Sequence, residues 1–474
     1  MKIRRAKNLY TYLLSFGASF IGIALNFFLA RVLKADDYGQ IQYLLALSTT
    51  IAQILIFGIN AFLIREAKNE KQNGSVINKC FSLYLVIVIF FVPIVYFVLN
   101  SFVSVTSGST FITFLVLVTA ILMGLNMIIT AYFQGRGKYH LSLIFENLLP
   151  KILMFSVAVI FLVIGNMLGF KERYLIFYIA IYSLIAIPFT IKYFRGLNFN
   201  FSKSELSSIF FFFGVTITYS LGNNLTKVLQ GSLYHNNIAL GIISVSISII
   251  SLVKVFTSVL DNLVKPIFAK KSRDKDYVGL INIYRFETRM NCYVAIPLYL
   301  FFIFNPIYFL SVFGETYTIY PQILSIIALA NAVADITGSN GALLAMTGKE
   351  KWELFNGFLY FAVYFSSIFI FSFDKIYGLT YGLLAAQICV NIAKYVEVWL
   401  LYKTNPLNLR TLLTLGITIL TNALTIYLIG FIHINYIFWL CIGAASGVAL
   451  VLINVSVTSL YRKTDFKELL NLRL

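Results

Sequence analysis

Charged residues are scarce in this chain of 474 residues: only 12% are Asp, Glu, Lys or Arg, whereas 59% are apolar. Soluble domains carry about 25% charged residues, so this composition excludes an ordinary soluble fold and indicates a polytopic membrane protein. Acidic residues are scarcer than basic ones, 19 against 37, and the formal net charge is +18. The basic residues lie in short segments between apolar runs and form no continuous stripe, so this excess does not indicate nucleic-acid binding.

Histidine and cysteine are also rare, and the common catalytic motifs are missing. The three histidines are too far apart in the sequence to indicate a ligand cluster, and the four cysteines show no C-x-x-C spacing. The sequence contains no G-x-x-x-x-G-K-[ST], no H-E-x-x-H and no G-x-S-x-G motif. We therefore expect no enzymatic activity, no metal site and no organic cofactor. Without a phosphate-binding loop, transport would draw on an ion gradient (H⁺ or Na⁺) or on the gradient of the substrate.

Long apolar runs dominate the chain. Runs of about 20 residues bounded by charges or turn residues have the length of a membrane-crossing helix, and we count fourteen of them. They cover residues 8–32, 40–64, 80–99, 111–133, 143–165, 174–194, 206–232, 238–262, 290–312, 320–346, 353–373, 378–402, 409–431 and 436–460. The predicted fold is an all-α polytopic membrane protein with about 14 transmembrane helices.

The distribution of basic residues predicts the orientation of these helices. If the amino terminus is cytoplasmic, most of the 37 Lys and Arg fall on the inner side, and the longest inner loop covers residues 265–290. The outer side then holds only Arg31, Lys34, Lys171, Arg173 and Lys375. Because inner loops are enriched in Lys and Arg, both termini are expected to be cytoplasmic. Anionic headgroups of the membrane lipids would attract the basic inner loop.

Polar or small residues recur with the same spacing in the first and the seventh expected helix, offset by 201 positions. The two sets are Ser15, Ser19, Gly22, Asn26 and Thr216, Ser220, Asn223, Lys227. This repeat predicts two six-helix lobes related by a pseudo-twofold axis along the membrane normal. The expected domains are residues 1–195, a cytoplasmic linker at 196–203, a second lobe at 204–403, and two further helices with a cytoplasmic tail at 404–474.

Lysines inside two neighbouring spans are the main candidates for substrate binding. Lys227 and Lys254 each lie on a polar face at helical spacing, and burying a lone Lys in lipid is costly. These faces would therefore line a water-filled cavity that receives an anion. Snorkelling of Lys227 to the interface, or pairing of either lysine within the helix bundle, is the alternative.

Four further charged residues inside spans are candidates for binding the substrate or the coupling ion. Lys151 contacts substrate or pairs with Glu146, and Arg31 contacts substrate or anchors the outer interface. Asp335, next to a Gly-containing break, is the candidate H⁺ or Na⁺ site. A second ion-coupling candidate is Glu397, unless Lys394 three residues earlier neutralises it.

Short motifs resemble the polysaccharide-unit flippases, the Wzx-like O-antigen and capsule transporters of the multidrug/oligosaccharidyl-lipid/polysaccharide (MOP) superfamily. They are Asn26-Phe-Phe-Leu-Ala-Arg31, Asp37-Tyr-Gly39, Gly58-Ile-Asn-Ala-Phe-Leu-Ile-Arg65, Phe313-Gly-Glu-Thr-Tyr317 and Leu343-Leu-Ala-Met-Thr-Gly-Lys349. The resemblance covers nearly the whole chain. The two helices beyond the twelfth depart from the simplest members and resemble the lipid II flippase branch.

The resemblance implies a MATE-like two-lobe bundle with a cationic cavity that alternates between the two membrane faces. Its cargo would be an undecaprenyl-diphosphate-linked oligosaccharide in the bacterial cytoplasmic membrane, with glycosyltransferases and a polysaccharide polymerase as partners. The residues that would bind the cargo are Lys227, Lys254, Lys151, Arg31, Asn26 and Asn223. The alternatives are a MATE-type cation-coupled drug exporter and a lipid II or teichoic-type precursor flippase of the same superfamily.

Overall fold

A computed structural model describes residues 2–67, 75–102, 110–164, 170–194, 196–371, 373–404, 412, 416, 419 and 420. The secondary structure of these residues consists of helices and the turns that join them, without a β-strand. The chain divides into two compact units, Met1–Ser244 and Val245–Leu474. The division falls inside α10 (Asn237–Arg273), whereas the lobe boundary expected from the sequence precedes α9. All-helical architecture is what the apolar runs predict, because only segments that satisfy their own backbone hydrogen bonds are stable in lipid.

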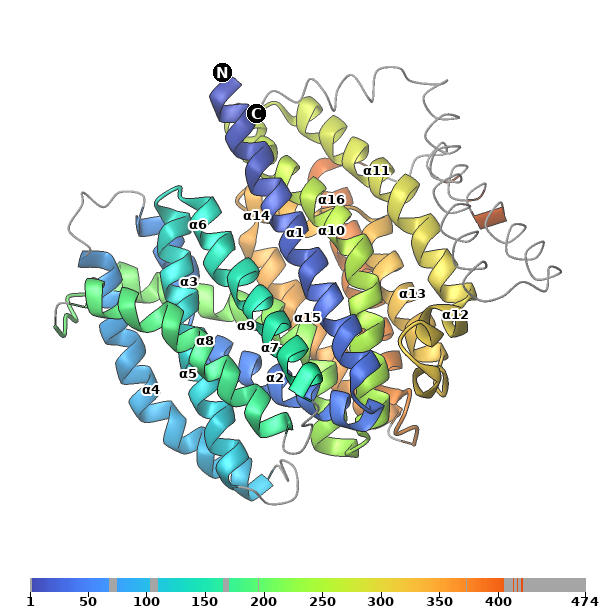
Figure 1. Ribbon diagram of the computed structural model, residues 1–474. Coiled ribbons are helices and arrows are strands. Elements are labelled where there is room, and N and C mark those ends of the chain that lie inside the picture. Colours follow the sequence, from blue (N-terminus) through green and yellow to red (C-terminus); the bar gives the residue numbers. More distant parts are fainter. Residues whose placement is uncertain are drawn as a thin grey trace. The chain divides into compact units, whose positions relative to one another are not determined.

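The first unit is built from helices that range from five to 31 residues (Figure 1). In chain order they are α1 (Lys2–Val32), α2 (Ala35–Ile56), α3 (Ile59–Glu66), α4 (Ser75–Phe102), α5 (Thr110–Gly135), α6 (Tyr139–Leu143), the π-helix η2 (Ile144–Leu148), α7 (Leu149–Ile164), α8 (Phe170–Tyr193), α9 (Lys203–Leu229), the π-helix η3 (Gln230–Tyr234) and the start of α10. Helix α5 packs against α2, α3, α4 and α8, and its buried side chains belong to the main core of this unit. Figure 1 shows α4, α5 and α8 side by side.

Two local sequence signals determine how helices in this unit begin and end. Ser202 and Glu205 form a capping box at the start of α9: the Ser202 hydroxyl accepts from Glu205 N, and Glu205 Oε2 accepts from Ser202 N at 2.7 Å. The run expected at 40–64 is broken by Phe57 and Gly58, with φ of 49° and 76°. Gly58 also permits close contact with α9, because a Cβ there would lie 2.4 Å from Phe213 N. The break therefore produces two helices, α2 and α3, in place of one.

The second unit contains the rest of α10, α11 (Tyr277–Phe304), α12 (Pro306–Ser311), the 3₁₀-helix η4 (Glu315–Thr318), α13 (Gln322–Ile336), α14 (Asn340–Met346), α15 (Glu350–Ile370) and α16 (Gly378–Tyr402). The expected long loop at 265–290 is wrong, because only three residues separate α10 from α11. Lys275 adopts φ 56° in this turn, and Asp276 caps α11 by accepting from Gly279 N at 2.9 Å. Charged residues in this region, such as Glu287, lie on a helix and not in a loop.

A break predicted in the tenth span is present. Helices α13 and α14 are bent by 44° across the connecting residues 337–339, and Gly338 has φ 73°. Glycine adopts this left-handed conformation without the steric cost that a side chain would impose. The sequence Thr337-Gly338-Ser339 therefore interrupts the span at the point where Asp335 lies.

Within the described ranges, eight helices are long and apolar enough to cross a membrane, and the bent α13–α14 pair makes nine if it is counted as one span. The expected runs at 8–32 and 206–232 overlap α1 and α9, and the run at 290–312 overlaps the second half of α11 and α12; none of these helices is among the eight. The runs at 409–431 and 436–460 lie outside the described residues, apart from a few isolated positions. The fold class is thus a multi-pass helical membrane protein, and the count of fourteen stays a prediction.

Candidate functional site

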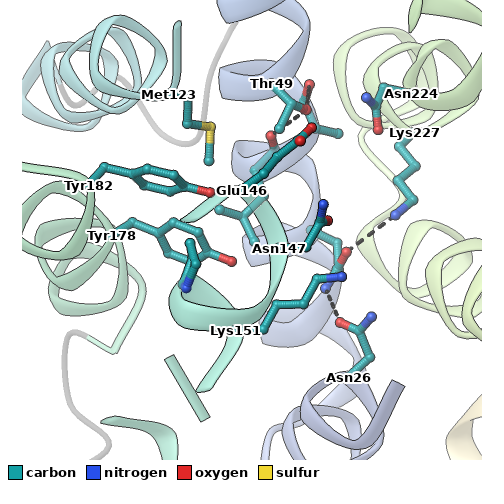
Figure 2. A pocket seen from close by; sticks show the side chains of 14 residues that line it. Asn26, Thr49, Met123, Glu146, Asn147, Lys151, Tyr178, Tyr182, Asn224 and Lys227 are labelled. Carbon is teal, nitrogen blue, oxygen red and sulfur yellow. Dashed lines mark hydrogen bonds between the residues drawn. The ribbon is translucent and has the colours of Figure 1, made fainter. Parts of the chain in front are cut away.

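A polar cavity of about 280 Å³ lies within the first unit, among α1, α2, α5, η2, α7, α8 and α9 (Figure 2). Its lining residues are Asn26, Gln42, Leu45, Ala46, Thr49, Met123, Glu146, Asn147, Pro150, Lys151, Tyr178, Tyr182, Asn224 and Lys227. Its polar part consists of amides, two ammonium groups, one carboxylate, two phenols and the hydroxyl of Thr49. Such convergence of a few polar groups in a concave site is typical of ligand binding.

Lys227 enters the cavity from the last turn of α9. Its Nζ donates to Gln42 Oε1 at 3.3 Å, and Gln42 Nε2 donates to Asn26 Oδ1 at 3.2 Å. Figure 2 shows this chain of hydrogen bonds, which links α9, α2 and α1. The repeat in the sequence pairs Asn26 with Lys227, and the structure places both on the wall of one cavity.

Lys151 enters from the first turn of α7, directly after the buried Pro150. Its Nζ donates to the backbone oxygen of Ala18 on α1 at 3.3 Å. Gly22 makes room for the side chain, because a Cβ at that position would lie 3.2 Å from Lys151 Cδ, Cε and Nζ. The absence of a side chain at Gly22 thus lets the lysine lie against α1.

Glu146 and Asn147 reach the cavity from η2. One π-helical turn inside an α-helix adds a residue and changes the direction of the side chains, and such turns are frequent at functional sites. The Glu146 side chain is exposed, whereas Asn147 is half-buried. The Glu146–Lys151 ion pair left open by the sequence is not formed at 4.0 Å, since Lys151 Nζ donates to Ala18 instead.

Tyr178 and Tyr182 supply the aromatic side of the cavity. They lie one turn apart on α8 with ring centroids at 5.9 Å and nearly parallel planes (23°). Tyr174, one turn earlier, continues the row with a centroid distance of 5.4 Å to Tyr178. In Figure 2 the two lining rings approach from the side opposite Lys227.

The balance of charge in the cavity is positive. Lys151 and Lys227 face one carboxylate, Glu146, and among the described residues neither lysine forms an ion pair. Their ammonium groups use neutral oxygens as acceptors, so a large part of their donor capacity stays available. Attraction between opposite charges at 4 Å rises from about 1 kcal/mol in water to about 4 kcal/mol near a protein surface. The cavity is therefore suited to an anion.

Three of the predicted binding residues meet in this cavity: Asn26, Lys151 and Lys227. Arg31 is exposed in the last turn of α1 and is not among the lining residues. The Asn223 side chain lies outside the described part of the chain. Lys254 belongs to the second unit.

In the second unit, Lys254 on α10 and Asp335 on α13 form an ion pair with Nζ 2.8 Å from Oδ1. The Tyr299 hydroxyl donates to the other carboxylate oxygen of Asp335 at 2.7 Å. Asp335 is buried, whereas 36% of the Lys254 side chain is exposed. Lys254, the predicted substrate-binding residue, and Asp335, the predicted ion-coupling residue, are thus partners in one ion pair.

The broken segment between α13 and α14 is held by carboxylates from two neighbouring helices. Glu287 Oε2 accepts from Ser339 N at 2.9 Å, and the Ser339 hydroxyl is hydrogen-bonded to Asp261. Tyr284 donates its hydroxyl to Thr337 O at 2.8 Å. These side chains satisfy backbone groups that the break leaves without helical partners. In the described ranges, no cluster of three or more His, Cys, Asp or Glu has the arrangement of a metal site.

Glu397, the second ion-coupling candidate, lies buried on α16 and accepts from Asn356 Nδ2 at 2.7 Å. Lys394, the neutralising partner suggested by the sequence, instead forms an ion pair with Glu353 on α15 at 2.6 Å. Both members of that pair are largely buried. The charges of this region therefore connect α15 with α16.

Several residues of these sites are not identified by any sequence pattern. Gln42 and Glu287 occupy positions that no spacing rule singles out, and Glu287 falls in the region where the sequence predicts a loop. Tyr178 and Tyr182 follow a four-residue spacing that could have been found, but the same spacing is typical of ordinary core aromatics. Their role depends on which face of α8 points to the cavity, which is a tertiary property.

Comparison with known proteins identifies the family and the fold. Residues 28–320 match the family described as "Polysaccharide biosynthesis protein", which covers more than half of the chain. Among curated protein sequences, none matches this chain significantly.

Solved structures with the same fold are membrane transporters. One is lipid II flippase MurJ in an inward closed conformation, with 16% identity, coverage of 96% of this chain and 100% of that chain, and a TM-score of 0.65. Another is an inward-facing MATE family multidrug resistance transporter of the MOP superfamily, with 12% identity, coverage of 81% and 94%, and a TM-score of 0.63. A third is a MOP superfamily transporter from Pyrococcus furiosus, with 13% identity, coverage of 83% and 95%, and a TM-score of 0.56. The resemblance drawn from the sequence motifs is therefore confirmed at the level of family and fold.

Proposed function

Because the chain belongs to the polysaccharide biosynthesis protein family and has the fold of MOP-superfamily transporters, we propose that it flips a lipid-linked oligosaccharide across the membrane. The cargo is an undecaprenyl-diphosphate-linked glycan unit that passes from the inner to the outer leaflet of the bacterial cytoplasmic membrane. Both termini lie in the cytoplasm, in agreement with the distribution of Lys and Arg along the sequence. Glycosyltransferases and a polysaccharide polymerase act before and after this step.

The observation that carries the proposal is the pair of lysines in the first-unit cavity. Lys151 and Lys227 converge on a polar space with neutral oxygens as their acceptors in the described structure. A diphosphate bears at least two negative charges and offers several acceptor oxygens to ammonium groups. Its apolar lipid chain stays in the bilayer while the polar head crosses through the protein. Alternating access of the cavity to the two membrane faces completes the cycle.

Ion coupling is the second part of the proposal, and its candidate site is Asp335 beside the α13–α14 break. Carboxylates near broken helices in membranes are commonly functional, since burying them without a role is costly. Lys254 and Tyr299 hold Asp335 in the described state. Binding of H⁺ or Na⁺ to Asp335 would compete with Lys254 for the carboxylate, so ion entry would release the lysine. Glu397 is the alternative ion-binding residue.

A lipid II or teichoic-type precursor flippase is the second candidate. The similarity to the lipid II flippase over 96% of this chain favours it, and the same lysines would bind the diphosphate of such a precursor. A MATE-type exporter of organic cations fits less well. The cationic cargo of such an exporter would be repelled by two ammonium groups in the cavity and attracted by only one carboxylate.

The test uses the purified chain in liposomes that contain a fluorescent undecaprenyl-diphosphate glycan. Loss of fluorescence to a membrane-impermeant quencher reports arrival of the head group at the outer leaflet. We expect flipping by the wild type and slow flipping by Lys151→Met and Lys227→Met. Flipping that is equal in the wild type, in both variants and in protein-free liposomes would contradict the proposal. Uptake of organic cations by the same liposomes would instead support the exporter.

A further inference from the structure

The end of the second unit where α14, α15 and α16 meet combines exposed lysines with an exposed apolar face of α16. We propose that Lys349, Trp399 and Lys403 bind the headgroup of an anionic phospholipid whose acyl chains lie along α16. The lipid is a resident ligand of this site and not the transported cargo, so the proposal goes beyond the proposed function. It would anchor this end of the second unit at the membrane surface.

The apolar face of α16 has the spacing of a lipid-facing helix. Ile392, Val396, Trp399 and Lys403 follow one another at steps of four, three and four, which places them on one side of the helix. All four side chains are exposed, and 49% of Trp399 is accessible. Helix α16 is one of the eight helices long and apolar enough to cross a membrane. Acyl chains are the natural partners of an exposed apolar stripe on such a helix.

Lys403 is the residue at which this stripe ends. Its Nζ lies 5.4 Å from the centre of the Trp399 ring, within the range of a cation–π contact. Its backbone has the left-handed conformation, φ 49°, which glycine usually adopts at the end of a helix. Tryptophan and lysine at the end of an apolar stripe are typical of the membrane–water interface, where the phosphates of lipids lie.

The turn between α14 and α15 brings a second lysine to the same end. The Tyr402 hydroxyl is hydrogen-bonded to the Thr347 hydroxyl. Lys403 directly follows Tyr402, and Lys349 follows Thr347 by two positions. Gly348, with φ 77°, allows the tight turn between Thr347 and Lys349. Two exposed ammonium groups on flexible side chains thus flank one hydrogen bond between helices, within reach of a single headgroup.

Hydrophobic packing holds the turn and the helix end together. Leu343 and Leu344 of α14 and Val398 of α16 are buried in one cluster with residues of α10 and α11, and Tyr402 packs against this cluster. Helix α14 also contacts α15. The backbone that carries both lysines is therefore ordered before a lipid binds, which lowers the entropic cost of binding.

Charge complementarity determines the class of ligand. Among the described residues, neither Lys349 nor Lys403 forms an ion pair. Each cation near a membrane surface raises the affinity for anionic lipid about fivefold. A zwitterionic headgroup brings its own ammonium group and gains less from the lysines. An acidic protein would match the lysines but not the apolar stripe beside them, whereas an anionic phospholipid matches both.

The experiment measures which lipid lies next to Trp399. The purified full-length chain is placed in phosphatidylcholine nanodiscs with rising fractions of brominated phosphatidylglycerol or brominated phosphatidylcholine. Bromine quenches nearby tryptophans, and the difference between the wild type and Trp399→Phe isolates the signal of Trp399. We expect a preference of about twentyfold for phosphatidylglycerol, which Lys403→Gln and Lys349→Gln each reduce about fivefold. Lys403→Arg retains the charge and should keep most of the preference.

Lys375→Gln is the matched control, because it removes an exposed lysine at the opposite end of the α15–α16 pair and should keep the wild-type preference. Equal quenching by the two lipids, or an equal effect of Lys403→Gln and Lys375→Gln, would overturn the site. Displacement of phosphatidylglycerol by millimolar inorganic phosphate would indicate a site for free phosphate instead of a lipid. Absence of quenching by either lipid would show that something other than lipid covers Trp399, and would overturn the proposal too.

Discussion

The ammonium nitrogen of Lys254 on α10 lies 2.8 Å from Asp335 Oδ1 on α13, so a residue expected to bind substrate is paired with one expected to bind the coupling ion. Tyr299 donates to the second oxygen of the same carboxylate. Both oxygens of Asp335 therefore have a partner, and whatever displaces Lys254 from the carboxylate frees a cation on α10. This contact links two roles that the sequence assigned separately.

The Lys254–Asp335 ion pair should stabilise the folded protein. Lys254→Met leaves a buried carboxylate without its cation, and we expect a loss of about 1–2 kcal/mol, below the value for a fully buried pair because Lys254 is partly exposed. Lys254→Met/Asp335→Asn should recover part of this loss. Thermal unfolding of the purified proteins measures both effects. If the losses of Lys254→Met and Asp335→Asn simply add in the double variant, the ion pair is not their source.

Asp335→Asn tests ion coupling. The amide keeps the shape of the side chain but neither titrates nor attracts a cation strongly, so transport should lose its dependence on the ion gradient. Flipping in liposomes with an imposed pH or Na⁺ gradient is the measurement. A variant that retains the full pH and Na⁺ dependence of the wild type would exclude Asp335 as the coupling site. Glu397→Gln, tested in parallel, would then identify the alternative.

Lys227→Ala should reduce glycan export about tenfold or more, the effect of losing roughly 1.4 kcal/mol of binding. The removed ammonium faces the cavity and donates only to Gln42 among the described partners. Surface glycan and protein level in the membrane are measured together. Lys351→Ala, which removes an exposed lysine at the first turn of α15, is the matched control. Normal surface glycan in Lys227→Ala would show that the cavity does not carry the cargo.

Gly39→Ala should destabilise the first unit by about 2 kcal/mol or more, since overpacking against backbone cannot relax by a rotamer change. A Cβ on Gly39 would lie 1.9 Å from the backbone oxygen of Asn237, where α10 begins. Gly17→Ala is the control, because a Cβ at Gly17 meets nothing within 4 Å. That change should be neutral or stabilise by up to about 1 kcal/mol through helix propensity. Equal unfolding temperatures for the two variants would contradict the close approach.

A pH-dependent contribution is expected at the α10–α11 turn. The hydrogen bond and ion pair from Lys271 at 2.6 Å, together with Gly279 N, lower the pKa of Asp276. A carboxyl with a lowered pKa in the folded state stabilises the fold above its unfolded pKa of about 3.9, and this contribution disappears as the pH falls through the folded value.

Asp276→Asn keeps the cap but removes the charge, so its unfolding temperature should fall below that of the wild type at pH 7. The difference should shrink as the pH drops below about 4. A difference that stays constant from pH 7 to pH 3 would show that the Lys271–Asp276 pair contributes nothing.

Much of the fold was predictable because membrane helices are local structures. About 20 consecutive apolar residues are sufficient to define a span, and each expected run through residue 402 overlaps one or more described helices. The break at Thr337–Ser339 was also predictable, since glycine marks it. The α10–α11 turn was missed because charged residues from 265 to 290 are typical of a loop, whereas Asp276 capping and the Lys275 turn keep them helical.

The candidate site was only partly predictable. Helical spacing alone placed Lys227 on a polar face, and the repeat paired it with Asn26. Because burying a lone lysine in lipid is costly, the sequence also indicated that Lys151 either pairs with another side chain or binds substrate. Gln42, Tyr178 and Tyr182 join them only because α1, α2, α8 and α9 converge on one space. Side chains from helices far apart in sequence meet through packing, which a periodic pattern does not contain.

The sequence by itself determined that this chain is a multi-pass helical protein with lysines inside its spans, because hydrophobicity and helical period act within about 20 residues of each other. Only the tertiary structure decided which charges are satisfied. It pairs Lys254 with Asp335 and Lys394 with Glu353, and it leaves Lys151 and Lys227 beside neutral oxygens in a cavity. Coulomb attraction depends on the distance between side chains in space, and that distance is set by how the helices pack.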